Sequence, residues 1–300
     1  VPAGGRTLAN TLLALEEATD GVALASGRYG FLASVSSDES LRNAAREWEE
    51  RLYRYGVDLS FREDLYEAVR AFAATPEAAT LTGEPARLLE HELRDYRRNG
   101  FELPAEERQQ LRAIFDELVS LDVQFRKNID EWDDGIVVRR EDLAGLPEAY
   151  VESLTKVEEA GEVRYRVSLD YPEIFPFMSN APSEELRREL FSRDQRKGGE
   201  ANVGVLERAL QLRHQAATML GYDSWAAYRT EIRMAKTREA VSNFLRDLRG
   251  KVTLKAGEDL QQMHDLAKER GVETVNIWDW RYYHNELLKT KYAVDDFEVA

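Results

Sequence analysis

Histidines are the first residues to test for chemistry, because histidine is the commonest metal ligand in proteins. The sequence has four histidines and no cysteine. A zinc site without cysteine needs about three histidine or carboxylate ligands, and two of them usually share one helical face at positions i and i+4. No two histidines are closer than 20 residues in the sequence, so their spacing predicts no zinc site: His91, His214, His264 and His284.

The nearest approach to a zinc motif runs from His91 to Asp95, where Asp95 stands in the place of a second histidine. Aspartate can bind zinc, so a metal-binding interpretation is not forbidden. A histidine beside a glutamate on a charged helix also arises by chance, and a solvated or capping role is the favoured interpretation of His91. The other three histidines lie in helical stretches and are interpreted as surface or edge residues.

No other catalytic pattern is found in the sequence. It has neither a GxSxG nucleophile motif nor a phosphate-binding Walker motif. It has 56 acidic residues, so no single pair of carboxylates stands out as a general acid and base. From residue chemistry alone, we predict no catalytic residue and no metal ligand.

The composition is typical of a globular chain with an acidic surface. Of its 300 residues 43% are hydrophobic, and the formal net charge is −15. Acidic charge argues against nucleic-acid binding, because phosphate backbones are bound by basic surfaces. No apolar run approaches the roughly 20 residues of a membrane-spanning helix. The absence of cysteine excludes disulfides and fits a cytoplasmic protein. The first residues, without Met or an apolar signal core, suggest a processed or recombinant start.

Most of the sequence has the 3.6-residue periodicity of amphipathic helices. Asn99-Gly100 and Gly221 are interpreted as helix stops, and Gly21 and Gly27 are expected to break the first helix. The longest regular signal begins at Pro104, a residue that is tolerated in the first turn of a helix. Helices are predicted over residues 6–32 with that break, 40–55, 64–72, 86–98, 104–129, 186–191, 203–220, 224–234 and 238–266.

The pattern changes between residues 132 and 178. Residues 135–138 and 163–169 are β-branched or alternate in polarity, as strands do. Pro172 and Pro176 are expected to prevent regular structure around residues 171–177. These patterns predict a mainly α protein, one helical unit with a small β-insertion of two or three strands around residues 135–170. From residue 277 we expect one more aromatic helix and then an extended tail.

Six stretches, in order along the chain, resemble the M3 family of zinc metallopeptidases, the thimet-oligopeptidase-like enzymes. Residues 88–100 are similar to the family's LRDFRRNG segment, and residues 277–283 are similar to its WD..YY motif. A single stretch of this kind is a weak signal, whereas six in the same order are a strong one. The stretches are residues 88–104, 118–128, 143–147, 171–188, 220–237 and 277–283.

The resemblance implies a multi-helix, neurolysin-like peptidase lobe beside a deep channel that admits short peptides. In the family, two histidines of an HExxH helix and a later glutamate hold zinc, and the motif's glutamate acts as base on the zinc-bound water. That motif lies downstream of WD..YY in the family and does not occur in residues 1–300. The resemblance therefore implies an amino-terminal lobe over residues 1–300, with a β-insertion at about 132–178 and no catalytic HExxH region.

The parent protein is accordingly expected to be a cytoplasmic zinc oligopeptidase that acts on short peptides together with a carboxy-terminal catalytic lobe. Zinc is expected in the full-length parent and not in this segment, which should be inactive alone. No nucleic-acid or membrane partner is expected. The alternative is a short, non-catalytic helical binding module derived from a peptidase lobe. Residues 294–300, which resemble the family's continuing chain, favour the first interpretation.

An aromatic cluster near the carboxy-terminal end provides the candidate contacts to a peptide. Its rings could stack on peptide side chains while its arginine held a carboxylate. The alternative is that these rings form the core of a terminal helix. Tyr171, Phe175 and Phe177, which are spaced by prolines, are interpreted as packing residues. The substrate-channel candidates, next to Trp278, are Trp280, Arg281, Tyr282 and Tyr283.

Overall fold

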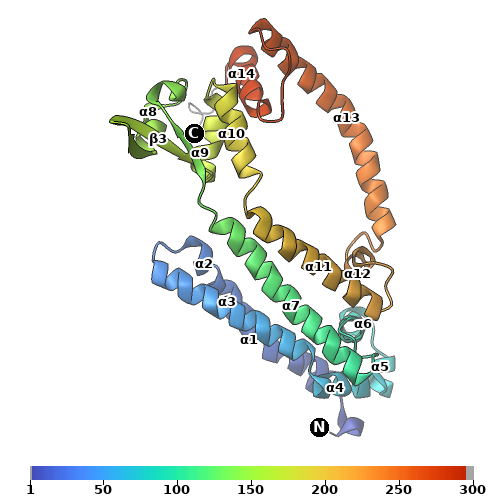
Figure 1. The fold of residues 1–300 in the computed structure, drawn as a ribbon. Helices are drawn as coiled ribbons and strands as arrows, with labels where there is room; N and C mark the ends of the chain where they lie inside the picture. The colour runs from blue at the N-terminus through green and yellow to red at the C-terminus, as the bar shows by residue number, and fades with distance from the viewer. Residues whose placement is uncertain (1, 295–300) are drawn as a thin grey trace. The chain divides into compact units, whose positions relative to one another are not determined.

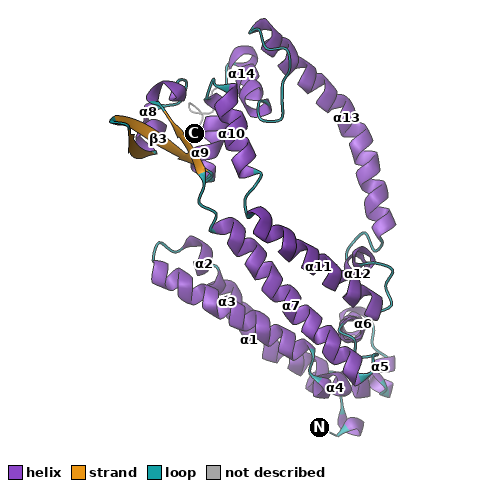
Figure 2. Ribbon diagram, in the orientation of Figure 1, coloured by secondary structure: helices purple, strands orange, loops and turns teal. Residues whose placement is uncertain are grey.

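The computed structural model describes residues 2–294 and divides into two compact units. Unit 1 comprises residues 1–120 and 209–228, and unit 2 comprises residues 121–208 and 229–300. Figure 2 shows that helices dominate the chain and that its strands form one small sheet. The predicted fold class, mainly α with a small β-insertion, is therefore confirmed. The tail predicted at residues 295–300 lies outside the described residues, and the single lobe over residues 1–300 stays a prediction.

Unit 1 is built from helices that pack side by side. Helix α1 packs against α3, and α4 packs against α6 (Figure 1). A short 3₁₀ turn and a five-residue π-helix (Ala9–Leu13) precede α1. The helices are α1 (Ala14–Gly30), α2 (Leu32–Val35), α3 (Glu39–Ser60), α4 (Glu63–Ala73), α5 (Pro76–Ala79), α6 (Gly83–Arg98) and the first part of α7 (Ala105–Asp130).

A core cluster of unit 1 lies where α4 and α6 meet. Val69 and Phe72 of α4 are almost fully buried there, together with Tyr96 of α6 and Phe101. Gly100 takes a φ of +82°, which lets the chain turn back at the end of α6. The turn brings the Phe101 ring to 5.1 Å from the Tyr96 ring. The helix stop predicted at this glycine is thus confirmed, and it also completes the core.

Unit 2 contains a three-stranded antiparallel sheet in the order β1–β3–β2. Glu159 pairs with Glu162 across a two-residue turn, which makes β2 and β3 a hairpin. Ala160 and Gly161 in that turn both have positive φ, 53° and 82°, as such tight hairpins require. The strands are β1 (Gly135–Val138), β2 (Thr155–Glu159) and β3 (Glu162–Ser168).

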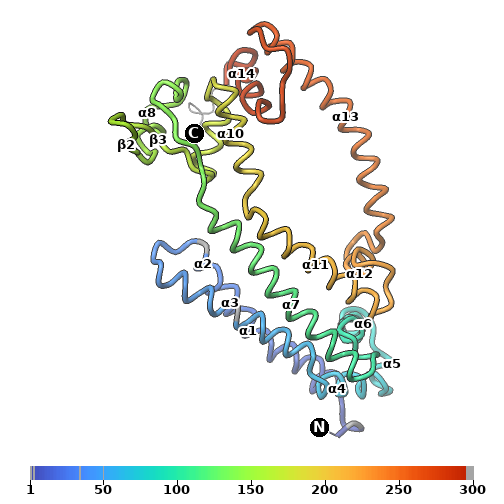
Figure 3. The backbone as a smooth tube through the Cα atoms, in the orientation of Figure 1, coloured from blue at the N-terminus to red at the C-terminus, as the bar shows by residue number. Residues whose placement is uncertain are grey.

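Helices pack on this sheet and continue unit 2. Helix α9 packs against β3 and α10 against β1, with Phe177 and Leu190 fully buried. Figure 3 traces α13 into the loop that leads back to α14.

Among residues 2–294, no helix is long and apolar enough to cross a membrane. The remaining helices, of which α11 and α12 cross the unit boundary, are α8 (Glu148–Ser153), α9 (Tyr171–Asn180), α10 (Glu184–Asp194), α11 (Gly199–Met219), α12 (Trp225–Glu231), α13 (Arg238–Glu269) and α14 (Trp280–Tyr292).

Two local expectations about helix breakers are wrong. Helix α1 continues through Gly21 and Gly27, because a glycine weakens a helix by about 1 kcal/mol but keeps its backbone hydrogen bonds. Helix α9 forms despite its two prolines. Pro172 lies in the first turn, where no N–H is needed, and the burial of Phe177 beside the sheet offsets the hydrogen bond that Pro176 cannot donate.

Candidate functional site

The four candidate contact residues lie in the first turn of α14 but not in one environment. Trp280 is 41% exposed, whereas Tyr283 is 3% exposed. Tyr283 packs with Met263 and Ala267 of α13, and burial raises the pKa of its hydroxyl. Successive helical residues point about 100° apart, so one turn can present both a core face and an open face. Tyr283 is a core residue here, and Trp280 is open to a ligand.

A buried ion pair fixes the start of α14 against α10. Arg187 donates from Nη2 to Asp279 Oδ1 at 2.6 Å, and the two side chains are 3% and 1% exposed. Arg187 Nη1 donates to the Ala181 carbonyl at 2.6 Å, and Asp279 Oδ2 accepts the Asn276 N–H at 3.1 Å. Because a buried charge is tolerated only when it is paired, these contacts determine where α14 begins.

Tyr282 belongs to the same contact. The Arg187 guanidinium carbon lies 4.3 Å from the centroid of the Tyr282 ring, and the Tyr282 hydroxyl accepts from Arg270 Nη1 at 3.3 Å. Tyr282 is half-buried, and its contacts with Arg187 and Arg270 help to hold α14 in place. Arg187 and Asp279 come from two of the stretches that resemble the M3 family. Two stretches that resemble the family and are distant in the sequence are therefore in contact in the structure.

Arg281 differs from these residues because it faces two rings and no acid. Its Cζ lies 4.4 Å from the centroid of Phe175 in α9 and 4.7 Å from the Trp280 ring. Within the described part of the chain, Arg281 forms no ion pair. A guanidinium stacked on rings keeps its charge and its N–H donors. Arg281 is therefore available to bind a carboxylate from a ligand.

The rings and cations near Arg281 form a continuous row on α9, on α14 and on the segment between α10 and α11. The Tyr171 ring lies 4.8 Å from the Phe175 ring, and Lys197 Nζ lies 5.8 Å from the Tyr171 ring. At the other end, the His284 ring lies 6.3 Å from the Trp280 ring. Tyr171 is 68% exposed, so the row is open along part of its length. We call this set the ring-and-cation row: Lys197, Tyr171, Phe175, Arg281, Trp280 and His284.

The row has the chemistry to bind an extended, negatively charged chain. Aromatic faces pack against aliphatic and aromatic side chains, and arginine binds a carboxylate through two parallel N–H groups. Lys197 is less available than Arg281, because its Nζ donates to the Leu169 carbonyl at 2.9 Å and lies 3.0 Å from Asp194. Arg281 is consequently the member best placed to hold an acidic group.

The described residues do not fit a catalytic zinc ion. The histidines are carried by four different helices, α6, α11, α13 and α14. In residues 2–294, no group of three or more histidine, aspartate or glutamate side chains is arranged to hold a metal ion. No step of a zinc-dependent reaction can therefore be assigned to the side chains in this part of the chain.

Comparison with known proteins gives matches to oligopeptidases. The model of Peptidase family M3 matches residues 177–299. Saccharolysin of Saccharomyces cerevisiae is 32% identical over 88% of this chain and 39% of its own length. The thimet-like oligopeptidase of Dictyostelium discoideum is 29% identical over 99% of this chain and 46% of its own. Oligopeptidase A of Salmonella typhimurium is 29% identical over 95% of this chain and 44% of its own length.

The fold and these matches define the chain as a mainly helical protein with a small β-insertion that is related to oligopeptidases. It belongs to peptidase family M3. The chain spans less than half the length of the three relatives described above.

Sequence reasoning missed part of the ring-and-cation row. Tyr171 was expected to be a packing residue, and its 68% exposure shows that this is wrong. Phe177 is fully buried, as expected, and Phe175 is half-buried. Tyr171 and Phe175 are four residues apart, a spacing that places two side chains on one helical face. That signal was hidden because the prolines suggested irregular structure instead of α9.

Proposed function

We propose that residues 1–300 are the amino-terminal lobe of a cytoplasmic zinc oligopeptidase and form part of the wall of its substrate channel. The substrates are short peptides. Zinc is the cofactor of the full-length parent, and a carboxy-terminal catalytic lobe supplies its ligands and the catalytic base. The match to Peptidase family M3 and the similarity to saccharolysin and oligopeptidase A support this proposal.

The observation that carries the proposal is the position of Arg281 between the rings of Phe175 and Trp280, without an ion-pair partner among residues 2–294. A peptide that lies along the row would place its terminal or side-chain carboxylate on Arg281. Its side chains would pack on Trp280 and Tyr171, which are both exposed. Tyr282 and Tyr283 are positioning residues in this arrangement, because they hold α14 against its neighbours.

Arg281→Gln tests the row directly. We expect a fluorescent pentapeptide with a free carboxylate to bind this chain about tenfold more tightly than its amidated form, because a charge-assisted hydrogen bond contributes about 1.5–3 kcal/mol. Arg281→Gln should remove that difference by weakening only the free-acid peptide. Fluorescence anisotropy measures both affinities.

The matched control is Arg188→Gln. Arg188 also lies over a ring, with its Cζ 5.3 Å from the centroid of Trp278, but it belongs to α10 and is outside the row. Its loss removes the same charge and should leave both affinities unchanged. An Arg281→Gln variant that binds the free-acid peptide as tightly as the wild type would refute the role of Arg281.

We further infer that residues 1–300 alone do not cleave peptides. The inference is supported by the absence of an HExxH motif from the sequence. After dialysis from one equivalent of zinc, the purified chain should retain no stoichiometric metal and should leave a quenched fluorescent peptide intact. Retention of one zinc ion per chain, with chelator-sensitive cleavage, would show that the catalytic residues are within this sequence.

A further inference from the structure

A pocket in unit 1 has features that the ring-and-cation row does not explain. It lies between α1, α3, α4 and α6 and has a volume of about 220 Å³. One water molecule occupies about 30 Å³ of the liquid, so the pocket has room for a ligand of several heavy atoms. Part of its wall is apolar and is formed by Leu15, Leu59 and Leu65. The pocket therefore suits a ligand with an aliphatic portion.

The polar part of the wall is acidic. Glu16, Glu92 and Asp95 line the pocket, and none of the described lining residues is basic. Asp95 is already paired, because Arg94 donates to both of its carboxylate oxygens at 2.8 and 3.1 Å. Glu92 is partly buried and has no ion-pair partner within residues 2–294. Its carboxylate is therefore a partly buried acceptor available to a cationic ligand, beside the exposed carboxylate of Glu16.

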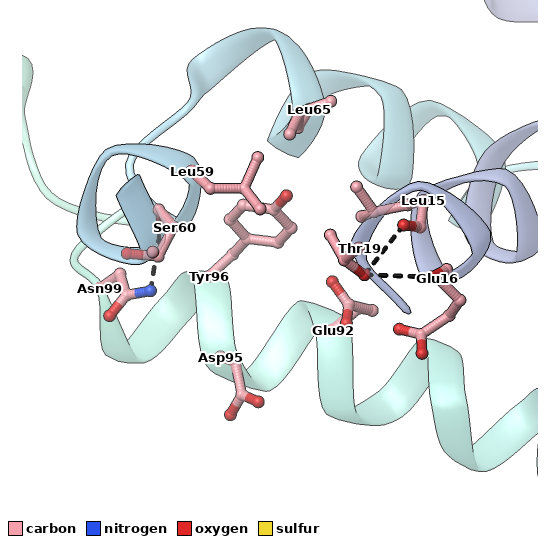
Figure 4. A pocket seen from close by; sticks show the side chains of 11 residues that line it. Leu15, Glu16, Thr19, Leu59, Ser60, Leu65, Glu92, Asp95, Tyr96 and Asn99 are labelled. Carbon is pink, nitrogen blue, oxygen red and sulfur yellow. Dashed lines mark hydrogen bonds between the residues drawn. The ribbon is translucent and has the colours of Figure 1, made fainter. Parts of the chain in front are cut away.

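Tyr96 provides a second, independent feature that points to a ligand. Only 6% of Tyr96 is exposed, and the centroids of the Tyr66 and Phe101 rings lie 5.4 and 5.1 Å from that of its ring. Figure 4 shows the ring projecting from α6 into the pocket, with Leu59 on one side and Thr19 on the other. Across the described residues, its hydroxyl has no hydrogen-bond partner. The hydroxyl oxygen is not fully enclosed, so a ligand in the pocket can form a hydrogen bond with it.

Most of the other polar side chains at the pocket are already engaged, and the remaining carboxylate, that of Glu16, is exposed. The Thr19 hydroxyl donates to the carbonyls of Leu15 and Glu16, each at 3.1 Å. Asn99 donates from its side-chain amide to the Ser60 carbonyl at 3.3 Å. Glu92 and Tyr96, which are four residues apart on α6, offer a partly buried free carboxylate and a free hydroxyl, and Figure 4 shows both on the pocket side of that helix.

We propose that this pocket binds a primary ammonium group carried on a short aliphatic stem. The ammonium group donates hydrogen bonds to the Glu92 carboxylate and to the Tyr96 hydroxyl oxygen, and the stem packs on the three leucines. A primary ammonium has three donors and no acceptor, which matches a wall that offers acceptors and no basic side chain. A neutral ligand of the same shape would leave the Glu92 carboxylate without a counter-charge. The source is either a free alkylamine or the lysine side chain of a peptide.

Isothermal titration calorimetry with n-pentylammonium chloride is the direct test. A ligand this small should bind with a dissociation constant of about 1 mM. Glu92→Gln should weaken binding by about tenfold or more, since it removes the charged acceptor. Tyr96→Phe should weaken it about threefold, the loss of one neutral hydrogen bond. Glu90→Gln is the matched control: it removes the same charge from an exposed position of α6 and should bind as the wild type does.

Further ligands separate the outcomes. 1-Pentanol has the same stem without the charge and should not bind measurably. Nα-acetyl-lysine amide that binds as well as pentylammonium would identify a peptide lysine as the source, and binding of the free amine alone would identify a small amine. Absence of saturable binding at 10 mM pentylammonium, about ten times the expected dissociation constant, or equal binding by wild type and Glu92→Gln, would overturn the proposal.

The pH dependence of binding provides an independent readout. Burial raises the pKa of Glu92, and the carboxylates of Glu16 on α1 and Asp95 on α6 raise it further, while Arg94 opposes them. Glu92 therefore takes up a proton at a higher pH than an ordinary glutamate does, whereas an alkylammonium, like lysine, has a pKa of about 10 and stays charged. Affinity should be full above the raised pKa of Glu92 and be lost as the pH falls through it. Glu92→Gln should bind weakly at every pH.

Folding does not obscure this test. Because the folded-state pKa of Glu92 is raised, the ionised side chain makes the native state less stable at neutral pH than a neutral one would. Glu92→Gln should accordingly unfold at the same temperature as the wild type or at a higher one. Weak binding by a Glu92→Gln variant with an undiminished Tm therefore reports the loss of the ligand contact.

Discussion

Asp279→Asn is expected to lower the free energy of unfolding of unit 2 by about 3–5 kcal/mol, because it leaves the Arg187 guanidinium buried without its counter-charge. The paired side chains are 3% and 1% exposed and lie 2.6 Å apart. Asparagine keeps the shape of the side chain and one acceptor, so the effect comes from the charge. Urea unfolding measures the loss. Amide hydrogen exchange over residues 280–292 should accelerate, because the pair fixes the start of α14.

Two further variants isolate the effect of burial. Asp122→Asn breaks an ion pair of the same type with Arg126, 2.6 Å apart on α7, but those side chains are 63% and 58% exposed. An exposed pair one helical turn apart contributes about 0.3–0.5 kcal/mol, so this control should be nearly neutral. Replacing both Arg187 and Asp279 by methionine and leucine should recover part of the loss, because no unpaired charge stays buried. Equal stability of Asp279→Asn and Asp122→Asn would mean that the pair does not position α14.

The same ion pair connects the fold to the proposed site. Asp279 immediately precedes α14, and Arg281 follows it by two residues on the first turn. Arg281 contacts the Phe175 ring of α9 only while that turn stays in place. A variant that loosens the Arg187 contact should therefore weaken peptide binding as well as stability. Arg281→Gln, by contrast, should change binding while the Arg187–Asp279 pair remains intact.

Local signals in the sequence were sufficient to predict most helices. Asn99-Gly100 ends α6 because a glycine accepts a positive φ at little cost, and this is a property of two residues. Pairing between distant residues could not be predicted in this way. Arg187 and Asp279 are 92 positions apart, and a chain with 41 basic and 56 acidic residues offers many equivalent partners. The choice among them is made by the packing of both α10 and α14 against α9.

The candidate site was predictable only in part for a related reason. A helix was expected around Trp280 and Tyr283, but periodicity does not say which of its faces meets a neighbour. The contact with Met263 and Ala267 of α13 decides that Tyr283 is buried. The pocket beside Glu92 depends on four helices at once, so no local pattern in the sequence could have indicated it.

Phe177→Ala is expected to lower the free energy of unfolding of unit 2 by about 3–5 kcal/mol, the range for removing a fully buried phenylalanine. Phe177 has no exposed surface and lies in the core between α9 and the sheet. Its removal takes away apolar contacts and leaves a cavity that the sheet and helices can only partly fill. Urea unfolding followed by circular dichroism measures the change in the free energy of unfolding. Amide hydrogen exchange should also become faster in β3, which packs against α9.

Tyr171→Ala is the matched control, since it truncates an aromatic ring on the same helix at a position that is 68% exposed. Because alanine is the strongest helix former, the free energy of unfolding of Tyr171→Ala should differ from that of the wild type by less than about 0.5 kcal/mol. Its peptide affinity should nevertheless fall, because the ring belongs to the ring-and-cation row. The two variants therefore separate the faces of α9. If Tyr171→Ala proved as destabilising as Phe177→Ala, Tyr171 would be a packing residue after all, and the row would begin at Phe175.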